Sequence, residues 1–562
     1  MRHLYLSLFT LGLTASGTLF AQPALEWAVP ITQRAGGSGY SLPYLEYPRL
    51  AAGSLGDIYF AGLAGGTRVA DFSVGREQMV ADGTDGNFYF VGQIDHSGHP
   101  AWVKLMSGMR GYGYVDTYTP YLLPLPSGGV QLVTTVQGPV VYGSDTLLSI
   151  NAEDTKLLIA QIDAAGEITA SSLLNWGQQD IDAVIRAADG DVLLAGRYRN
   201  FNDVLGNLQL AANSSPAYFI ARLSPEGQVR WATSLSAAKE WGSLGNAYGL
   251  LETRSGAIAI TLGPAGRQFT IAGCGDNRLP LQLAMLEGST GEVRYLKELG
   301  RTRFGYLSDL AEAPNGDLYA AGSQGGGIWA ANGETGPAAD AANCNVVGGF
   351  VLKVDPISGQ VQDLAARHNH LRGTRISFLT DGSYVVSGVG RPVESAEDPT
   401  TMAGAVLSHY DRYDQLLSSV QVTEYSSYRE NWATVIGSGE NAVYLSTLYE
   451  GTILGERQRP ADFFGASMVV SRLNFPAAPS ASGLPLRVFP NPLTDWINVY
   501  AADMTEASAF LLYDATGRQI ASYPVVPNRT QHSLYLGDLP NGAYFLRLSS
   551  DKNARATTII KQ

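Results

Sequence analysis

The chain has 562 residues, of which 45% are hydrophobic and only 16% are charged, so a large buried core is possible and general disorder is excluded. The formal net charge of −13 and the lack of a long Lys/Arg run argue against nucleic acid as a partner, because phosphate binding needs a basic patch. Abundant glycine (64 residues) and tyrosine (29 residues) at low charge are typical of short strands joined by tight turns.

Residues 1–21 are predicted to be a secretory signal peptide. A polar start at Arg2 and His3 precedes the apolar run "LYLSLFTLGL", and small residues then lead to Ala21. We expect cleavage after Ala21, with cleavage after Gly17 as the alternative. No later apolar run reaches the roughly 18 residues that a membrane-spanning helix needs, so no transmembrane segment is predicted.

The region after this leader is dominated by an internal repeat of about 64 residues. One signature is a turn followed by an apolar strand, for example "DGDVLLAG" and "NGDLYAAG". Its seven copies align on the turn glycines Gly56, Gly128, Gly190, Gly256, Gly316, Gly382 and Gly439. A second signature, a hairpin such as "FIARLSPEGQVRW", follows each copy, and glycine suits its turn because glycine accepts a positive φ.

Each repeat therefore offers about four strands, enough for one small twisted sheet. Such a sheet buries both faces only when copies pack against one another around an axis, which is the logic of a β-propeller. The seven copies predict an all-β fold with a seven-bladed β-propeller over residues 22–475. Over roughly residues 25–475 the repeats resemble bacterial seven-bladed propeller repeat proteins, a scaffold-like family that implies no single reaction.

The last repeat lacks its fourth strand after "MVVSRLNF". The N-terminal segment Leu25–Ile31 carries the pattern of that strand, with Trp27 standing where Trp231 stands in the third repeat. We expect this segment to complete the seventh blade and close the ring, because an open ring would expose a strand edge. The alternative is that Trp27 packs elsewhere in the core.

The repeats contain no G-x-S-x-G, H-E-x-x-H or Walker motif. We therefore predict no catalytic residue, no metal ligand and no cofactor. Two segments, "SPEGQVRW" and "LEGSTGEVRY", approach the motif spacings of sialidase-type and quinoprotein propellers. We interpret both as ordinary hairpin chemistry.

Loop lengths favour one face of the propeller as a binding surface. The connections between repeats, and those between the second and third strands, are long and would lie on the same face. They gather aromatic and Arg side chains, which are enriched at binding hot spots and suit sugar rings. The same residues would also be explained as aromatics buried between blades. The candidate ligand-binding residues are Tyr112, Tyr114, Trp241, Tyr425, Tyr428 and Arg429.

Only two cysteines occur, Cys274 and Cys344, which are too few for a disulfide framework or a four-ligand zinc site. In an exported protein these two could pair with each other across neighbouring blades. The alternative is two isolated thiols.

The C-terminal residues follow a different pattern. Residues 476–485, rich in Pro, Ala and Ser, are interpreted as a linker. Residues 486–562 alternate short strands with turns, which predicts a small Ig-like β-sandwich. The motifs "FPNP", "LYDATGRQI", "LPNGAYFLRL" and the terminal "TTIIKQ" resemble the C-terminal sorting domain of type IX secretion cargo. The residues that match the family's motifs are Pro490, Asn491, Pro492, Gly517, Gly542, Tyr544 and Lys561.

This resemblance implies a Bacteroidetes-type cell envelope and Sec export to the periplasm. Transport across the outer membrane by the type IX machinery, the partner of this domain, would follow. Removal of the domain and attachment to cell-surface lipopolysaccharide usually come next. The domain would be a transport address with no catalysis of its own.

The leading hypothesis is an exported, surface-attached or released monomeric propeller that binds an extracellular glycan or protein. The competing hypothesis is a glycan-active hydrolase or lyase with its site in the central funnel. Such an enzyme needs two carboxylates, or a carboxylate and a His, facing each other across that funnel. A purely structural envelope protein is the third possibility.

Overall fold

The structure is a computed structural model of the chain. It describes residues 23–35, 44–53, 56–65, 69–75, 77–79, 88–107, 120–137, 140–143, 145–148, 155–176, 180–198, 204–206, 208–209, 217–236, 249–263, 278–335, 347–367, 370–390, 404–412, 414–422, 434–438, 442–448, 452–453, 456–457, 465–475, 487–489, 496–500, 509–524, 531–549 and 557–561. All forty-two elements of regular structure in these ranges are β-strands. The described part of the chain is therefore all-β, as the sequence predicts. It contains no helix long and apolar enough to cross a membrane.

Two compact units divide the chain. The first comprises Met1–Tyr410 and Leu416–Pro476, and the second comprises Asp411–Gln415 and Ala477–Gln562. The predicted leader, residues 1–21, and the predicted linker, residues 476–485, lie outside the described residues.

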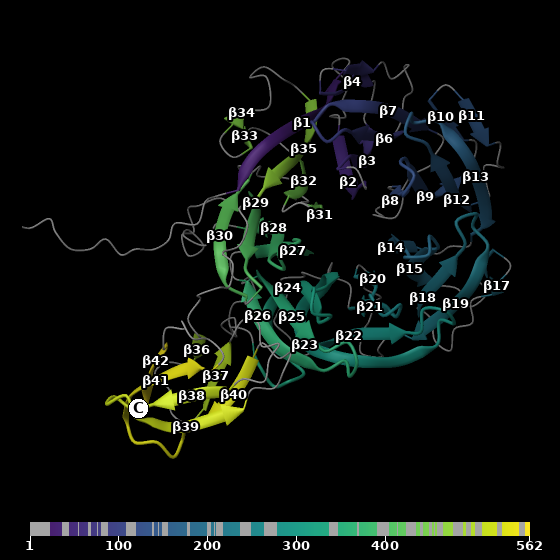
Figure 1. The fold of residues 1–562 in the computed structure, drawn as a ribbon. Helices are drawn as coiled ribbons and strands as arrows, with labels where there is room; N and C mark the ends of the chain where they lie inside the picture. Colours follow the sequence, from purple (N-terminus) through teal and green to yellow (C-terminus); the bar gives the residue numbers. More distant parts are fainter. Residues whose placement is uncertain are drawn as a thin grey trace, which may run out of the picture. The chain divides into compact units, whose positions relative to one another are not determined.

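Antiparallel four-stranded groups are the repeating element of the first unit (Figure 1). The first group is β2 (Tyr44–Ala52), β3 (Ile58–Gly65), β6 (Phe88–Ile94) and β7 (Pro100–Ser107), extended by β10 (Val140–Tyr142) and β11 (Asp145–Leu148). The second is β8 (Tyr121–Pro124), β9 (Val130–Gln137), β12 (Thr155–Ile162) and β13 (Ile168–Asn175). The third is β14 (Asp180–Arg186), β15 (Val192–Tyr198), β18 (Ala217–Leu223) and β19 (Val229–Ser236); β16 (Val204–Leu205) and β17 (Leu208–Gln209) form a separate ribbon.

The next two groups share one strand and so form a single seven-stranded sheet. Its members are β20 (Leu250–Glu252), β21 (Ile258–Leu262), β22 (Leu279–Leu286), β23 (Val293–Glu312), β24 (Leu318–Ala330), β25 (Val347–Val354) and β26 (Val361–Arg367). The 20-residue strand β23 ends one group and begins the other. A further group is β27 (His370–Phe378), β28 (Tyr384–Gly390), β29 (Gly404–Tyr410) and β30 (Leu416–Gln421).

The last group joins the two ends of the repeat region. Its strand order is β31 (Thr434–Ser438), β32 (Ala442–Leu448), β35 (Gly465–Asn474) and β1 (Ala24–Ala35), extended by β4 (Val69–Val74) and β5 (Glu77–Met79). A small ribbon contains β33 (Thr452–Ile453) and β34 (Glu456–Arg457). Strand β1 pairs antiparallel with β35, with Leu25 opposite Leu473 and Ile31 opposite Met468.

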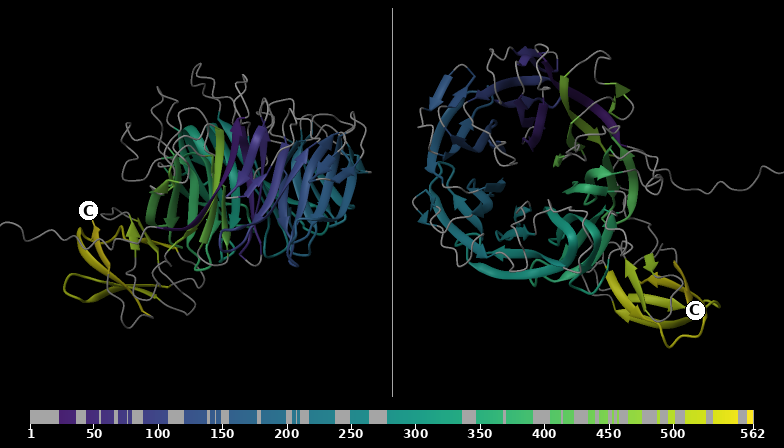
Figure 2. Two further views of the ribbon diagram at one scale, coloured as in Figure 1. Left: turned by 90° about the horizontal axis from the view of Figure 1, so that it is seen from above. Right: turned by 180° about the vertical axis from the view of Figure 1, so that it is seen from behind.

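The core of the first unit lies between successive sheets. Figure 2 shows from behind that these sheets follow one another around a common axis. Each junction holds its own cluster of buried apolar side chains; one of them joins Val29 of β1 and Met468 of β35 to Phe60 of β3. A single four-stranded sheet has two apolar faces, and burying one large apolar side chain contributes roughly 1.5–3 kcal/mol. Packing both faces against neighbours therefore explains why one repeat is insufficient alone.

A turn glycine repeatedly marks these junctions. Gly98, in the β6–β7 turn, has φ +85°, and a Cβ added there would lie 2.7 Å from the Trp27 ring. Gly291 stands against the Trp231 ring in the same manner, with φ +73°. Trp27 thus takes the same place relative to the first sheet that Trp231 takes relative to the fourth group. Only glycine combines this backbone conformation with so close an approach.

The second unit contains two sheets. One has the order β36 (Arg487–Phe489), β37 (Trp496–Tyr500) and β40 (Gln531–Tyr535). The other has the order β39 (Gln519–Pro524), β38 (Ala509–Tyr513), β41 (Gly542–Leu548) and β42 (Thr557–Lys561). Buried side chains from both, such as Ile497 and Phe510, form one apolar cluster.

Candidate functional site

The aromatic and Arg residues predicted to bind a ligand all belong to the long connections between strands. The six candidate ligand-binding residues lie outside the described residues: Tyr112, Tyr114, Trp241, Tyr425, Tyr428 and Arg429. The same holds for Cys274 and Cys344, so their pairing stays a prediction.

A polar cluster forms instead on the innermost strands, which are the first strands of successive groups (Figure 1). The guanidinium carbon of Arg49, on β2, lies 3.5 Å from the ring centroid of Tyr121 on β8. The Tyr121 hydroxyl donates a hydrogen bond to the carbonyl of Ile181 on β14, at 3.1 Å. Arg49 Nε is buried and has no hydrogen-bond partner within the described part of the chain. We call Arg49, Tyr121, Asp182, Asp309 and Arg375 the inner-strand cluster.

Three charged residues affect the pKa of Tyr121. Burial raises the pKa of its hydroxyl above the ordinary value of 10, the neighbouring Arg49 lowers it, and Asp182 raises it. Arg375, on β27, also acts on Tyr121 and lowers its pKa. β27 and β8 belong to groups that are not neighbours, so the charge of Arg375 acts on Tyr121 over a longer range than that of Arg49.

The two aspartates of the inner-strand cluster have different partners. Asp182 is almost fully buried, and its Oδ1 forms an ion pair with Arg197 Nη2 at 3.0 Å. Asp309 lies 3.9 Å from Arg375 Nη1, and its Oδ2 accepts a hydrogen bond from the Ile376 amide at 2.9 Å. Burial raises the pKa of Asp309 above its ordinary value, although Arg375 opposes that shift.

This arrangement can hold a charged or strongly polar group near the axis. Arg49 is stacked on an aromatic ring, which fixes its plane, and arginine donors match carboxylate and other planar acceptors. Asp309 is a carboxyl whose proton affinity is raised, so the same region also carries an acid.

The sequence contained a signal for this cluster that motif searching missed. Four of the residues stand seven positions before a turn glycine, so they occupy one position of the repeat: Arg49 before Gly56, Tyr121 before Gly128, Asp309 before Gly316 and Arg375 before Gly382. Asp182 stands eight positions before Gly190, one residue away from this repeat position, at the register shift between Ile181 and Ala183 of β14. Reading the repeat column by column would have found these polar residues.

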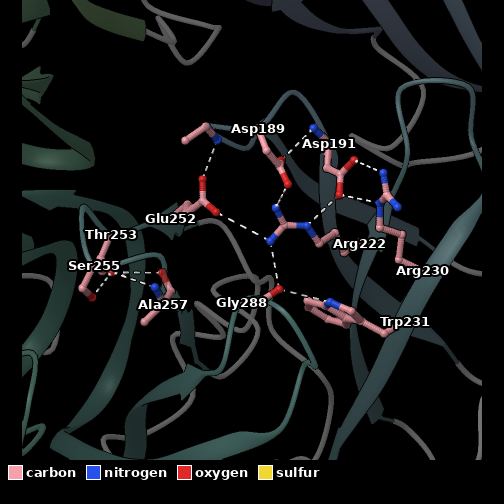
Figure 3. Close-up of polar contacts among 11 residues, drawn as sticks. Asp189, Asp191, Arg222, Arg230, Trp231, Glu252, Thr253, Ser255, Ala257 and Gly288 are labelled. Carbon is pink, nitrogen blue, oxygen red and sulfur yellow. Dashed lines mark hydrogen bonds and ion pairs between the residues drawn. The ribbon is translucent and has the colours of Figure 1, made fainter.

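A second polar group, the Arg222 network, lies at the hairpin turns of the third and fourth groups (Figure 3). Arg222 Nε pairs with Asp191 at 2.8 Å, and its Nη2 pairs with Asp189 at 2.6 Å. Its Nη1 donates to the Gly288 carbonyl at 2.8 Å and lies 3.6 Å from Glu252.

The Arg222 network follows a position that recurs along the chain. Where the third group has Arg222 and Asp191, the first has Gln93 donating to Asp57 at 2.9 Å. The fifth group has Lys353 paired with Asp317 at 2.9 Å. A polar side chain on the third strand thus repeatedly anchors the residue after the turn glycine, which indicates a structural role.

In the second unit, four of the seven predicted motif residues are described. Gly517 has φ +85° and closes a turn in which Asp514 accepts hydrogen bonds from the Thr516 amide and hydroxyl. The Tyr544 hydroxyl donates to the Pro540 carbonyl at 2.7 Å. Lys561 is buried and lies opposite Gly542 in the β41–β42 pairing. Pro490, Asn491 and Pro492 lie outside the described residues.

No cluster of three or more His, Cys, Asp or Glu side chains that could hold a metal ion occurs among the described residues.

Comparisons with solved structures give weak similarities. A protein of unknown function from Dyadobacter fermentans DSM 18053 is 12% identical, with 64% of this chain and 94% of that chain covered and a TM-score of 0.38. The quinohemoprotein alcohol dehydrogenase of Comamonas testosteroni is 11% identical, with 75% and 77% covered and a TM-score of 0.29. A puromycin-hydrolyzing peptidase of Mycobacterium tuberculosis is 11% identical, with 82% and 60% covered and a TM-score of 0.39. No curated protein matches the sequence.

The family comparison is specific to the C-terminal region. Residues 487–562 match the family model described as the secretion system C-terminal sorting domain. The match begins at β36 and spans both sheets of the second unit, and it includes all seven motif residues that the sequence analysis identified. The C-terminal region of this chain therefore belongs to the type IX secretion sorting-domain family, which marks the protein for export and for the cell surface or the medium.

Proposed function

We propose that the first unit is a seven-bladed β-propeller whose ring is closed by β1. The pairing of β1 with β35 supports this, as does the ion pair between Glu26 and Arg472 Nη1, 3.1 Å long. Asn474 Nδ2 adds a hydrogen bond to Glu26 at 2.8 Å. The second unit, in this proposal, is an Ig-like sandwich.

Closure can be tested by removing the strand. A mature protein that lacks residues 22–31 should lose several kcal/mol of stability, since Val29 and Ile31 are buried in the junction between the last and first sheets. Replacing only Glu26 by Gln is the milder matched variant. Equal melting temperatures for the deletion and the parent protein would contradict closure.

The propeller serves, in this proposal, as an extracellular binding module for a glycan or protein, working as a monomer after Sec and type IX export. The observation that carries the proposal is the inner-strand cluster, where Arg49 stacks on Tyr121 and makes no ion pair with the described residues. Its residues come from β2, β8, β14, β23 and β27, so groups from several elements converge there, as ligand sites require.

A glycan array and a surface-protein pull-down with the mature protein test the binding function. Arg49→Ala and Arg375→Ala should abolish retention of the ligand, because Arg49 stacks on the Tyr121 ring and the Arg375 charge acts on the same side chain. Arg254→Ala, at an exposed turn where the side chain donates to Pro314, is the matched control. Ligand retention unchanged in both inner-strand variants would refute the inner-strand site.

The competing function is a glycan-active hydrolase or lyase, and one observation favours it. Asp309 has a raised pKa, as a general acid needs, and a second carboxyl, Asp182, belongs to the same cluster. If this function is correct, the protein should depolymerise a glycan that it binds, and Asp309→Asn should lower the rate by about 10²-fold or more while binding persists. Binding without turnover would leave the binding module as the function.

A further inference from the structure

Strands β23 and β24 form a hairpin that is unusually long for this repeat. β24 has 13 residues, whereas the second strands β3 and β28 have 8 and 7, and its pairing with β23 runs from Gly300–Ala330 to Glu312–Leu318. The outer part of the hairpin pairs Thr302 with Ile328, and β22 adds Leu279 beside Thr302. Strands β22, β23 and β24 are therefore paired with one another in this outer part, which extends beyond the length of the second strands in other groups.

Three arginines and a tryptophan gather on this extension. Arg278 Cζ lies 3.8 Å from the Trp329 ring centroid, and Arg303 Cζ lies 5.8 Å from the same centroid. Arg301 is directly opposite Trp329 in the strand pairing, which places both side chains on one face of the sheet. We call Arg278, Arg301, Arg303 and Trp329 the arginine–tryptophan patch.

Arg278 is the arginine of this patch whose N–H groups can bind a ligand. Arg301 is neutralised by Glu298, 2.7 Å from its Nε. Arg278 is exposed and makes no hydrogen bond or ion pair with the described residues. Stacking on the indole fixes the plane of its guanidinium, so less conformational entropy is lost when its N–H groups bind a ligand.

The occupied aromatic face decides the chemistry of the ligand. A neutral sugar would need a free ring to stack on, but Arg278 already covers a face of Trp329. On this covered face the guanidinium makes the contact with a ligand, and guanidinium groups match carboxylates bidentately. Adjacent strands are about 4.8 Å apart, so the patch presents positive charge at intervals suited to a stiff polymer with closely spaced carboxylates.

We propose that the arginine–tryptophan patch binds an acidic polysaccharide through carboxylate contacts to Arg278. This inference rests on the proposed binding function and deepens it, because it names the ligand class and assigns it to a surface outside the inner-strand cluster. A stiff sugar polymer is favoured over an acidic peptide because it loses less conformational freedom on binding to a fixed guanidinium.

The test uses the full mature protein and three immobilised probes: polygalacturonate, fully methyl-esterified polygalacturonate, and poly-L-glutamate. We expect the protein to bind polygalacturonate best, with weaker binding at higher salt. Arg278→Ala should weaken it about fivefold, which corresponds to one exposed charged contact. Arg278→Glu should weaken it further, and Arg294→Ala is the matched control because Arg294 is an exposed arginine of the same strand, ion-paired with Glu287.

The outcomes separate this inference from the proposed function. If Arg278→Ala binds polygalacturonate as the parent does while Arg49→Ala does not, the binding function stands and the patch is refuted. Tighter binding to poly-L-glutamate than to polygalacturonate would overturn the polysaccharide assignment. If the parent protein binds no glycan and no surface protein at all, the proposed function and this inference both fail. Melting temperatures within a few degrees of the parent show that each variant is folded.

Discussion

Arg222 and Arg49 occupy contrasting environments in the same unit. Arg222 is 7% exposed, and its three nitrogens contact two aspartates, a carbonyl and, at longer range, Glu252. Arg49 lies over Tyr121, and its buried Nε has no partner among the described residues. A saturated arginine has no donor left for a ligand, so its contribution is to stability. Arg49 makes no ion pair with the described residues, so its charge is available for recognition.

Their places in the repeat sharpen this contrast. Arg222 occupies a third-strand position where other groups also have a polar side chain anchoring a turn. Arg49 occupies a position on an innermost strand, where the residue type changes from Arg to Tyr to Asp between groups. A position with one repeated role is explained by folding, whereas the varied position near the axis has no such common explanation.

The largest expected effect is on stability, from Arg222→Ala. The substitution leaves Asp191, which is 2% exposed, with only the exposed Arg230 as its cation. Breaking a buried pair in this way costs about 3–5 kcal/mol. Chemical denaturation should show this loss, while ligand retention per folded molecule stays unchanged.

Arg294→Ala supplies the matched control for that substitution. Arg294 and its partner Glu287 are both exposed, so the pair should contribute less than about 1 kcal/mol. Equal losses for Arg222→Ala and Arg294→Ala would mean that the Arg222 network does not stabilise the junction.

A smaller effect is expected from pH, through the residue that takes the place of Arg222 in the sixth group. His409 is fully buried, and its Nε2 lies 2.9 Å from the Ser383 hydroxyl. Its Nδ1 has no partner in the described part of the chain. Burial lowers the pKa of His409 from 6.5 to about 4, although Asp381 opposes the shift. The neutral ring is therefore the form that the fold holds.

The sign of the pH effect follows from this lowered pKa. As pH falls below 6.5, the unfolded chain takes up a proton that the folded protein does not. The free energy of unfolding should therefore decrease between pH 6.5 and 4, by about 3 kcal/mol in total, and His409 should cause no further loss below pH 4. Urea denaturation of the parent and of His409→Gln across this range measures the difference. Parallel pH profiles for the two proteins would contradict the role of His409.

The strand pattern of this chain was predictable because it is periodic. A turn glycine followed by an apolar strand recurs every 64 residues or so, and each copy needs neighbours to bury its faces. The sorting domain was predictable for a different reason: "LPNGAYFLRL" and its companion motifs form a specific combination, and the family match covers them. The sequence also predicted a strand at Leu25–Ile31, which lies within β1.

The inner-strand cluster was harder to predict because its members come from strands far apart in the chain. Arg49 and Arg375 are separated by more than 300 residues, and neither belongs to a catalytic motif. The sequence favours the aromatic-rich long loops as the binding surface, since loops often carry function. The polar residues found near the axis lie instead on strands, where their common distance from a turn glycine was the available signal.

The last prediction tests the other side of the comparison. Arg49→Ala removes a guanidinium whose described contact is the Tyr121 ring, so its stability cost should stay near the value of about 0.5–1 kcal/mol for an exposed to half-buried cation–π contact. Ligand binding should nevertheless be lost, and Arg49→Lys should recover only part of it, because an ammonium keeps the charge but lacks the planar fork. Melting temperature and ligand retention are measured on the same samples. Arg49→Ala should lose ligand retention with little change in melting temperature, whereas Arg222→Ala should lower the melting temperature and keep ligand retention. If both substitutions destabilise the protein equally and both spare binding, the absence of an ion pair does not distinguish a recognition arginine from a structural one in this molecule.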